Sequence, residues 1–462
     1  MKDSTYEFAH GKILPIVFKL TIPAVLAQLI TFLYNVIDRM YVSNIKGIET
    51  EALAALGIIL PISIIVLAFS NLIGLGGSPI ASIKLGQNQK EAANRIFNNS
   101  FFLLLIIGIL TTIILLIFGE DIIKLFGCPD NAIPYANDYL RIYAIGSIFI
   151  VLVQGLNPFI SAQGNALLAM STILIGAILN IILDPIFIFT FNLGIKGASL
   201  ATILSQFISF IWVIFFFLKK SEHFKIKISE MKLKLVIIKS IFYLGLSSFI
   251  MDLTESLIQI VFNVCLKMST GGNSSDYTAA LTIMLSALQL ISLPLNGLGY
   301  GIAPFVSYNY GRGDSYRIKS GIKYTFIIAL IFAILIYIPS MIFPQIYAYL
   351  FNADTDVKDL VIKYCPLFLM GSIMFPIQMT LQNINVALNQ GKTATILAVT
   401  RKIILLIPLC FLFTFIFNFK GVYLSEGVAD LIAGTITGIV IFTTFPKVIK
   451  RREIEAKQVT KF

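Results

Sequence analysis

Charged residues and histidine are scarce in this sequence, and their scarcity excludes several classes of protein. Asp, Glu, Lys and Arg make up 13% of the 462 residues, whereas soluble domains carry about 25%. The two histidines, His10 and His223, both fall outside the long apolar segments. The sequence contains no HExxH motif, nucleophile motif or phosphate-binding loop. A soluble domain is therefore excluded, and an intramembrane enzyme is the least favoured function.

Cysteine is also rare and gives no sign of a metal centre. Cys128, Cys265, Cys365 and Cys410 lie far apart, without a CxxC pair or the spacing of metal ligands. We therefore expect free thiols and no cofactor. The first apolar segment is not followed by a cleavage site of small residues, so we expect it to be a permanent span rather than a signal peptide.

Long apolar runs dominate the sequence. Hydrophobic residues make up 57% of the chain, and runs of about 20 residues are long enough to cross roughly 30 Å of hydrocarbon as helices. We predict an all-α integral membrane protein with twelve transmembrane helices. They lie near residues 13–38, 50–79, 95–118, 133–159, 166–190, 195–218, 236–266, 278–303, 318–343, 358–386, 394–417 and 421–446.

The net charge of +11 follows the predicted topology. Most of the 35 Lys and Arg residues fall in segments on the same side as both termini, which is the positive-inside pattern. This pattern predicts cytoplasmic N- and C-termini. It also accounts for the surplus positive charge, so we expect the lipid bilayer as a partner and no nucleic acid.

An internal repeat relates the two halves of the chain. "NLIGLGGSPIASIKLG" at 71–86 aligns without a gap to "NGLGYGIAPFVSYNYG" at 296–311, with six identities in sixteen positions. Because each half has an even number of spans, the repeats are parallel and related by a pseudo-two-fold axis along the membrane normal. We predict two six-helix lobes, 1–218 and 235–446, a cytoplasmic linker at 219–234, and a cytoplasmic tail at 447–462.

The repeated stretch keeps glycine and proline at matching positions. These are Gly76 with Gly301 and Pro79 with Pro304. Small residues let membrane helices approach closely, and proline frees a backbone carbonyl. Plain helix packing is the favoured interpretation, and a hinge in each lobe is the alternative.

Acidic residues lie inside several predicted spans, where an ionised group costs about 2.5–3.5 kcal/mol on insertion scales and is a functional candidate. The first half has Asp38 and Asp184, and the second half has Asp252, Glu255, Glu426 and Asp430. Lys and Arg are expected near the span ends, so the deep charge would be entirely acidic. Asp252 and Glu255 share one helix face, whereas Glu426 and Asp430 are interpreted as structural or as lining a rim.

The segment "NIILDPIFIF" at 180–189 carries the strongest local signal. Asn180 and Asp184 are four residues apart and share a helix face. Pro185 lacks an N–H, which leaves the carbonyl of Ile181 without its helical partner. Asn35 and Asp38 repeat the combination of amide and acid. These hard oxygen ligands suit a proton or a small cation such as Na⁺; a structural acid bound to a neighbouring helix is the alternative.

With these features the chain resembles the multidrug and toxic compound extrusion (MATE) family of cation-coupled efflux transporters. The resemblance rests on "YNVIDRMYVS" at 34–43, "AQGN" at 162–165, "LNIILDPIFIF" at 179–189 and "IKGASLAT" at 195–202. It covers essentially the whole chain. The short N-terminal segment and the LDP turn look most like its MepA-like bacterial branch.

The resemblance implies a cation-coupling site in the first lobe. Carried onto this sequence, its residues are Asp38, Asn180 and Asp184, with Asn157 and Tyr139 as weaker candidates. In the second lobe Glu255, with its neighbour Asp252, matches one acid of a second cation or drug site. In the tenth span the segment "FLMGSIMFPIQMTLQNINVALNQG" at 368–391 has no acid, which departs from the family pattern and favours the first lobe.

The function that the resemblance implies is export of organic cations and drugs in exchange for Na⁺ or H⁺ by alternating access. The expected location is the plasma membrane of a bacterium, where the protein would act as a monomer. The alternative is a flippase for lipid-linked saccharides of the same superfamily. Such a flippase should have a basic cavity for pyrophosphate, and the sequence indicates buried acids instead.

Overall fold

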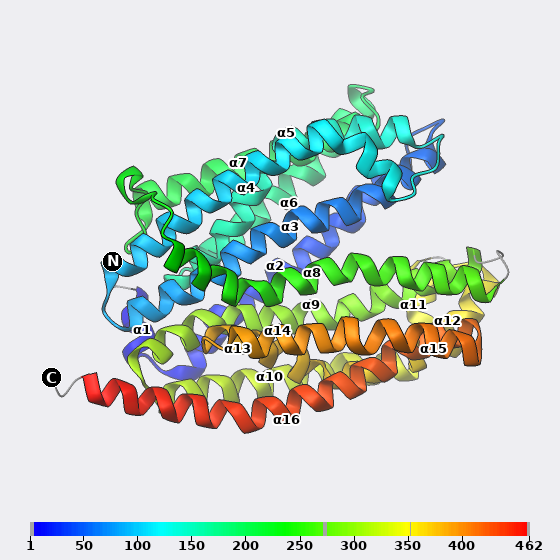
Figure 1. Ribbon diagram of the computed structural model, residues 1–462. Helices are drawn as coiled ribbons and strands as arrows, with labels where there is room; N and C mark the ends of the chain where they lie inside the picture. The colour runs from blue at the N-terminus through cyan, green and yellow to red at the C-terminus, as the bar shows by residue number, and fades with distance from the viewer. Residues whose placement is uncertain (1–3, 271–274, 352, 460–462) are drawn as a thin grey trace. The chain divides into compact units, whose positions relative to one another are not determined.

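The chain folds into long α-helices (Figure 1). The computed structural model describes residues 4–270, 275–351 and 353–459, and no β-strand occurs in these ranges. The long helices of the first half are α2 (Ile13–Val42), α3 (Glu49–Gly86), α4 (Lys90–Leu125), α5 (Ile133–Ala162), α6 (Ala166–Pro185) and α7 (Ile195–Phe215). Those of the second half are α8 (Leu235–Ser269), α9 (Ser275–Arg312), α10 (Ser315–Ile342), α12 (Thr355–Leu369), α14 (Gly391–Val399), α15 (Ile407–Phe417) and α16 (Phe419–Val459). The prediction of an all-α membrane protein is confirmed.

Eleven helices of the described residues are long and apolar enough to cross a membrane, and a bent pair makes a twelfth span. The pair consists of Thr355–Met374 and Pro376–Ala387, which meet at 42°. Pro376 opens a wide π-helical turn, η5 (Pro376–Leu381), before α13 (Gln382–Ala387). Because proline cannot donate the helical hydrogen bond and collides with the preceding turn, the helix bends at this point.

Two further π-helical turns interrupt spans that carry charged residues. Pro185 ends α6, and the chain continues through η1 (Ile186–Thr190). In the eleventh span η6 (Thr400–Leu406) joins α14 to α15, and it contains Arg401 and Lys402. A π-turn widens the helix by one residue per turn and is frequent at functional sites.

The helices form two compact units, defined by their internal contacts. Unit 1 contains the residues up to His10 and Leu26–Asp252; unit 2 contains Gly11–Val25 and the residues from Leu253 onward. Helices α2 and α8 therefore each divide between the units, and the lobes 1–218 and 235–446 stay a prediction. In unit 1, α5 packs against α3, α4 and α7, and in unit 2 α9 packs against α10, α12 and α13.

The repeated glycines lie where these divided helices pack. In unit 1, a Cβ on Gly76 of α3 would collide with the backbone of α8 at Ile241 and Gly245. In unit 2, a Cβ on Gly301 of α9 would stand 2.8 Å from both the Leu20 carbonyl oxygen and the Thr21 Cα of α2. Each glycine thus admits the first helix of the other repeat. This close approach accounts for glycine at both positions, and a hinge at Pro79 or Pro304 stays a prediction.

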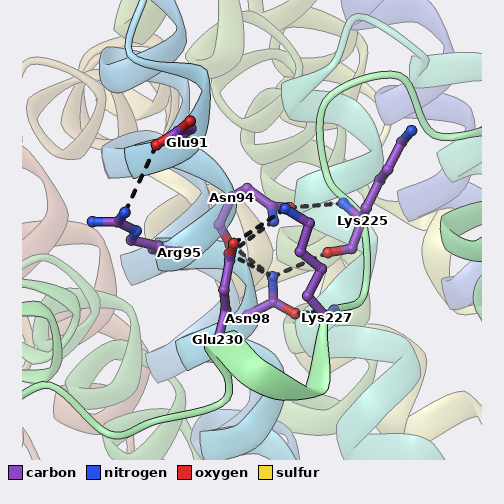
Figure 2. A network of polar contacts seen from close by, with 7 residues as sticks. All are labelled: Glu91, Asn94, Arg95, Asn98, Lys225, Lys227 and Glu230. Carbon is purple, nitrogen blue, oxygen red and sulfur yellow. Dashed lines mark hydrogen bonds and ion pairs between the residues drawn. The ribbon is translucent and has the colours of Figure 1, made fainter.

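The segment between the sequence repeats is docked on α4 (Figure 2). The side-chain oxygens of Asn94, Asn98 and Asn99 accept backbone N–H groups of the linker, at 2.7 Å from Lys225, 2.9 Å from Lys227 and 3.0 Å from Lys234. The Asn98 amide also donates to the Lys225 carbonyl at 3.0 Å, and the Asn94 amide donates to Glu230 at 2.9 Å. Phe224 stacks on Phe97 nearby. The predicted linker is thus an ordered part of unit 1.

We expect Asn98→Ala to loosen this docked segment. The substitution leaves the Lys227 N–H and the Lys225 carbonyl without the Asn98 side chain, and each such hydrogen bond contributes about 0.5–1.5 kcal/mol net. The thermal midpoint of the purified protein should fall, and trypsin should cleave at Lys225 and Lys227 faster. Arg95→Ala is the matched control, because its 3.7 Å pair with Glu91 is exposed and such pairs contribute little. Equal trypsin rates for the two variants would contradict the docking.

Candidate cation-binding site

Two carboxyl groups meet inside unit 1. Asp38, late in α2, and Asp184, at the end of α6, lie within hydrogen-bonding reach of each other. Asp184 is fully buried and Asp38 is half-buried. The two acids are far apart in the sequence and were expected to share one coupling site, and their side chains do lie together.

The amide of Asn180 holds the Asp184 side chain in place. Its Nδ2 lies 3.2 Å from Asp184 Oδ1 and 3.4 Å from Thr202 Oγ1 of α7. Thr202 in turn donates to the Ala198 carbonyl at 3.1 Å. The predicted pairing of Asn180 and Asp184 on one helix face is confirmed by this contact. Pro185 follows directly and begins the wide turn η1, so α6 ends at the acid.

Tyrosine hydroxyls surround the acidic pair. Tyr139 of α5 lies within hydrogen-bonding reach of Thr202, and Tyr143, one turn further along α5, lies within reach of Ser63 of α3. Tyr34, one turn before Asp38 on α2, is close enough to act electrostatically on both acids. Tyr34, Tyr143 and Thr202 were not predicted. Tyr34 lies four residues before Asp38, and Tyr143 lies four residues after Tyr139, so these spacings could have indicated both tyrosines. Thr202 is the last residue of the motif "IKGASLAT".

Several oxygens of the group have no partner. Asp38 Oδ1, Asp184 Oδ2 and Asn180 Oδ1 are buried and accept no hydrogen bond from the part of the chain that the structure describes. Neither acid forms an ion pair with any described Lys or Arg; Arg39, next to Asp38, is exposed. Two touching carboxylates cannot both stay ionised without a positive charge between them. The arrangement can therefore hold one proton, or a small cation.

The remaining candidates of the first lobe do not all join this group. Asn35 lies one turn before Asp38 and is half-buried. Asn157 is in the same helix as Tyr139, but 18 positions further on, about 27 Å along the axis at 1.5 Å per residue. Its buried Oδ1 also has no partner among the described residues. The distance along α5 separates Asn157 from the acidic pair.

Unit 2 contains buried bases, which corrects the expectation that deep charge is entirely acidic. Arg401 and Lys402, expected near a span end, are 5% and 4% exposed. Arg401 Nε lies 2.7 Å from Asp430 Oδ1, and its Nη2 lies 3.8 Å from Glu426 Oε1. Lys402 Nζ lies 2.9 Å from Glu255 Oε2. The two bases can lie inside the span because each is paired with a carboxylate, and a buried charge without a partner is costly.

The structure assigns Asp252 and Glu255 to different surroundings, although they were predicted as one pair. Asp252 accepts a 2.8 Å hydrogen bond from Asn71 of α3 and belongs to unit 1. Glu255 belongs to unit 2, where Lys402 lies against it. The lysine ammonium thus occupies the place beside Glu255 that a coupling cation would take. A cation or drug site at Asp252 and Glu255 stays a prediction.

Eleven apolar helices and one bent pair in the described residues, a buried acidic pair and an internal duplication are together typical of a polytopic membrane transport protein. Comparison with known proteins assigns it more closely. The sequence profile of the MatE family matches residues 23–186 and 248–412, so the chain belongs to the MatE family.

Named relatives agree with this assignment, and solved structures share the fold. The chain is 25% identical to the multidrug export protein MepA of Staphylococcus haemolyticus and 24% identical to that of Staphylococcus aureus, over 96% of both chains in each case. A MOP superfamily transporter from Pyrococcus furiosus, described as having a binding pocket of reversed polarity, superposes with a TM-score of 0.89 at 24% identity, covering 97% of this chain and 99% of that one. An outward-facing multidrug resistance MATE transporter superposes with a TM-score of 0.89 at 23% identity, with the same coverage of both chains.

Proposed function

We propose that this protein is a multidrug efflux antiporter, which exports organic cations in exchange for H⁺ or Na⁺. Membership of the MatE family and similarity to the MepA multidrug export proteins support the efflux of drugs. The observation that carries the coupling is the contact between Asp38 and Asp184 without a basic ion-pair partner among the described residues.

The acidic pair gives the exchange a physical basis. When the pair binds a proton or Na⁺, the repulsion between its carboxylates is relieved; when the cation leaves, the repulsion returns. The ion therefore favours one conformation, and the drug must bind the two conformations with different affinity to be moved. One elementary charge crossing about 100 mV supplies roughly 2.3 kcal/mol. For a neutral solute this energy sustains about a fiftyfold gradient; a monovalent organic cation exchanged one for one moves no net charge and depends on the concentration gradient of the coupling ion.

The proposal includes a location and an assembly. The distribution of Lys and Arg supports cytoplasmic termini, and the similarity to staphylococcal proteins supports the plasma membrane of a bacterium. We propose that the protein works as a monomer, with a coupling ion and no further cofactor.

One argument against the flippase alternative was the expected lack of buried bases. That argument no longer holds, but no observation supports a flippase. Arg401 and Lys402 are buried bases, although the sequence predicts only acids at this depth. Both are neutralised by carboxylates at 2.7 and 2.9 Å, so they do not form the free positive charge that a pyrophosphate group requires. Drug efflux remains the favoured function.

Transport in vesicles tests the proposal. The purified protein is reconstituted, and uptake of a fluorescent organic cation is followed under a proton gradient alone, a Na⁺ gradient alone, and neither. We expect accumulation above the level of empty vesicles with at least one gradient. Accumulation that is equal with and without ion gradients would refute coupled transport, and a response to protons alone would exclude obligatory sodium coupling.

A further inference from the structure

Unit 2 contains a buried cluster of charged side chains whose positive and negative charges do not cancel. The cluster consists of Glu255 from α8, Arg401 and Lys402 from η6, and Glu426 and Asp430 from α16. It sets three carboxylates against two cations. The side chains of Arg401, Glu426 and Asp430 are 2–6% exposed, and that of Glu255 is 39% exposed. One negative charge is thus in excess inside the helix bundle, where an uncompensated charge is costly.

The excess charge is concentrated on Glu426. Asp430 has the close contact with Arg401, at 2.7 Å, whereas Glu426 is 3.8 Å from the same guanidinium. Lys402 is engaged by Glu255 at 2.9 Å. Glu426 Oε2 and Asp430 Oδ2 are both buried without a hydrogen-bond partner in the described ranges. Of the three acids, Glu426 therefore has the weakest compensation and an oxygen free to accept a proton.

The surroundings favour a proton over a metal ion. The charged groups that act on Glu426 are Arg401 and Lys402 from η6, Glu255 from α8, and Asp430 from its own helix. Two of these four groups are cations, and Arg401 contacts both acids of α16. No group of three or more His, Cys, Asp or Glu side chains in the described chain is placed to hold a metal ion. A proton needs only one oxygen and leaves the guanidinium in place.

We infer that unit 2 has a proton-binding site of its own, in which the Glu426 carboxyl carries the proton that balances the cluster. Glu255, whose side chain is 39% exposed, is the member of the cluster at which a proton can enter or leave. The site itself follows from unit 2 alone, and its use in the transport cycle rests on the function proposed above. The second lobe would then take part in proton coupling without an acid in the segment 368–391 of the tenth span.

Infrared difference spectroscopy of the purified protein tests this site without requiring transport. At neutral pH, exposed carboxylates are ionised, so the C=O stretch of a carboxylic acid reports buried, protonated groups. We expect Glu426→Gln to remove one such band and Asp184→Asn to remove a different one. Glu120→Gln, at an exposed residue paired with Lys124, should leave the spectrum unchanged.

A second variant, Asp430→Asn, keeps the inference testable if Glu426→Gln does not fold. Asp430→Asn leaves Arg401 free to pair with Glu426, which restores the charge balance, so the Glu426 band should also disappear. A wild-type carboxyl signal in folded Glu426→Gln would overturn the inference. So would loss of the band from the wild-type protein on adding Na⁺ at constant pH, because the site would then bind sodium. If Asp184→Asn abolishes transport but keeps the Glu426 band, the proton-binding site of unit 2 is distinct from the Asp38–Asp184 pair of unit 1.

Discussion

Asp184→Asn should abolish gradient-driven transport and reduce accumulation of the organic cation to the level of empty vesicles. The amide is nearly the same size and can keep a hydrogen bond to Asn180, which now donates to Asp184 at 3.2 Å. It cannot release or bind a proton and has no charge for Na⁺. The measurement is vesicle uptake under the gradient that drives the wild-type protein. Asp38→Asn should give the same loss, because either change leaves one carboxylate where two are needed.

The matched control for this prediction is Asp138→Asn. Asp138 lies on α5, one residue from Tyr139, but its side chain is 43% exposed and pairs with Lys196 at 3.2 Å. An exposed pair of this kind contributes little to stability, so transport should persist at the wild-type rate. Folded Asp184→Asn protein that still concentrates the cation would remove the acidic pair from the coupling mechanism.

Arg401→Met should cause the largest loss of stability. The methionine fills much of the space but leaves Glu426 and Asp430, each 1% exposed, without the guanidinium. Removing one partner of a buried ion pair typically costs about 3–5 kcal/mol. The free energy of unfolding of the detergent-purified protein, or its thermal midpoint, measures the effect. Arg401→Lys should lose less, since lysine keeps the charge but lacks the planar fork that reaches two acids.

Two further variants separate the charge from the packing of Arg401. Adding Asp430→Asn to Arg401→Met should recover part of the lost stability, because one of the unpaired acids is removed. Lys457→Met is the surface control: its pair with Glu453 is just as short, at 2.7 Å, but the lysine side chain is 72% exposed. If Arg401→Met melts at the wild-type temperature, the buried network has no structural importance.

The acidic site of unit 1 could be predicted from sequence, whereas the ion network of unit 2 could not. Asp38 and Asp184 stand alone in apolar surroundings, so the energetic cost of each acid made it a candidate by itself. Arg401 and Lys402 follow the polar segment that begins the eleventh span, and this position predicts that they lie near the end of the span. The helix begins at Gly391, so Arg401 lies about 15 Å inside it. Pairing with acids from α8 and α16 makes that depth tolerable, and such pairing is a property of the tertiary structure.

The helical spans were predictable for a similar reason, and the boundary between compact units was not. Each apolar run is long enough to indicate a span without knowledge of its neighbours. The assignment of Gly11–Val25 to unit 2 depends on α2 packing against Gly301. The repeated glycine was visible in the sequence, but the helix that it contacts was not.

The way in which α4 holds the linker limits how this protein can evolve. Asn94, Asn98 and Asn99 accept backbone N–H groups at Lys225, Lys227 and Lys234, and every residue except proline offers that group. Natural variation should therefore change the side chains at these three linker positions freely while avoiding proline. The asparagines, in contrast, should tolerate almost no replacement.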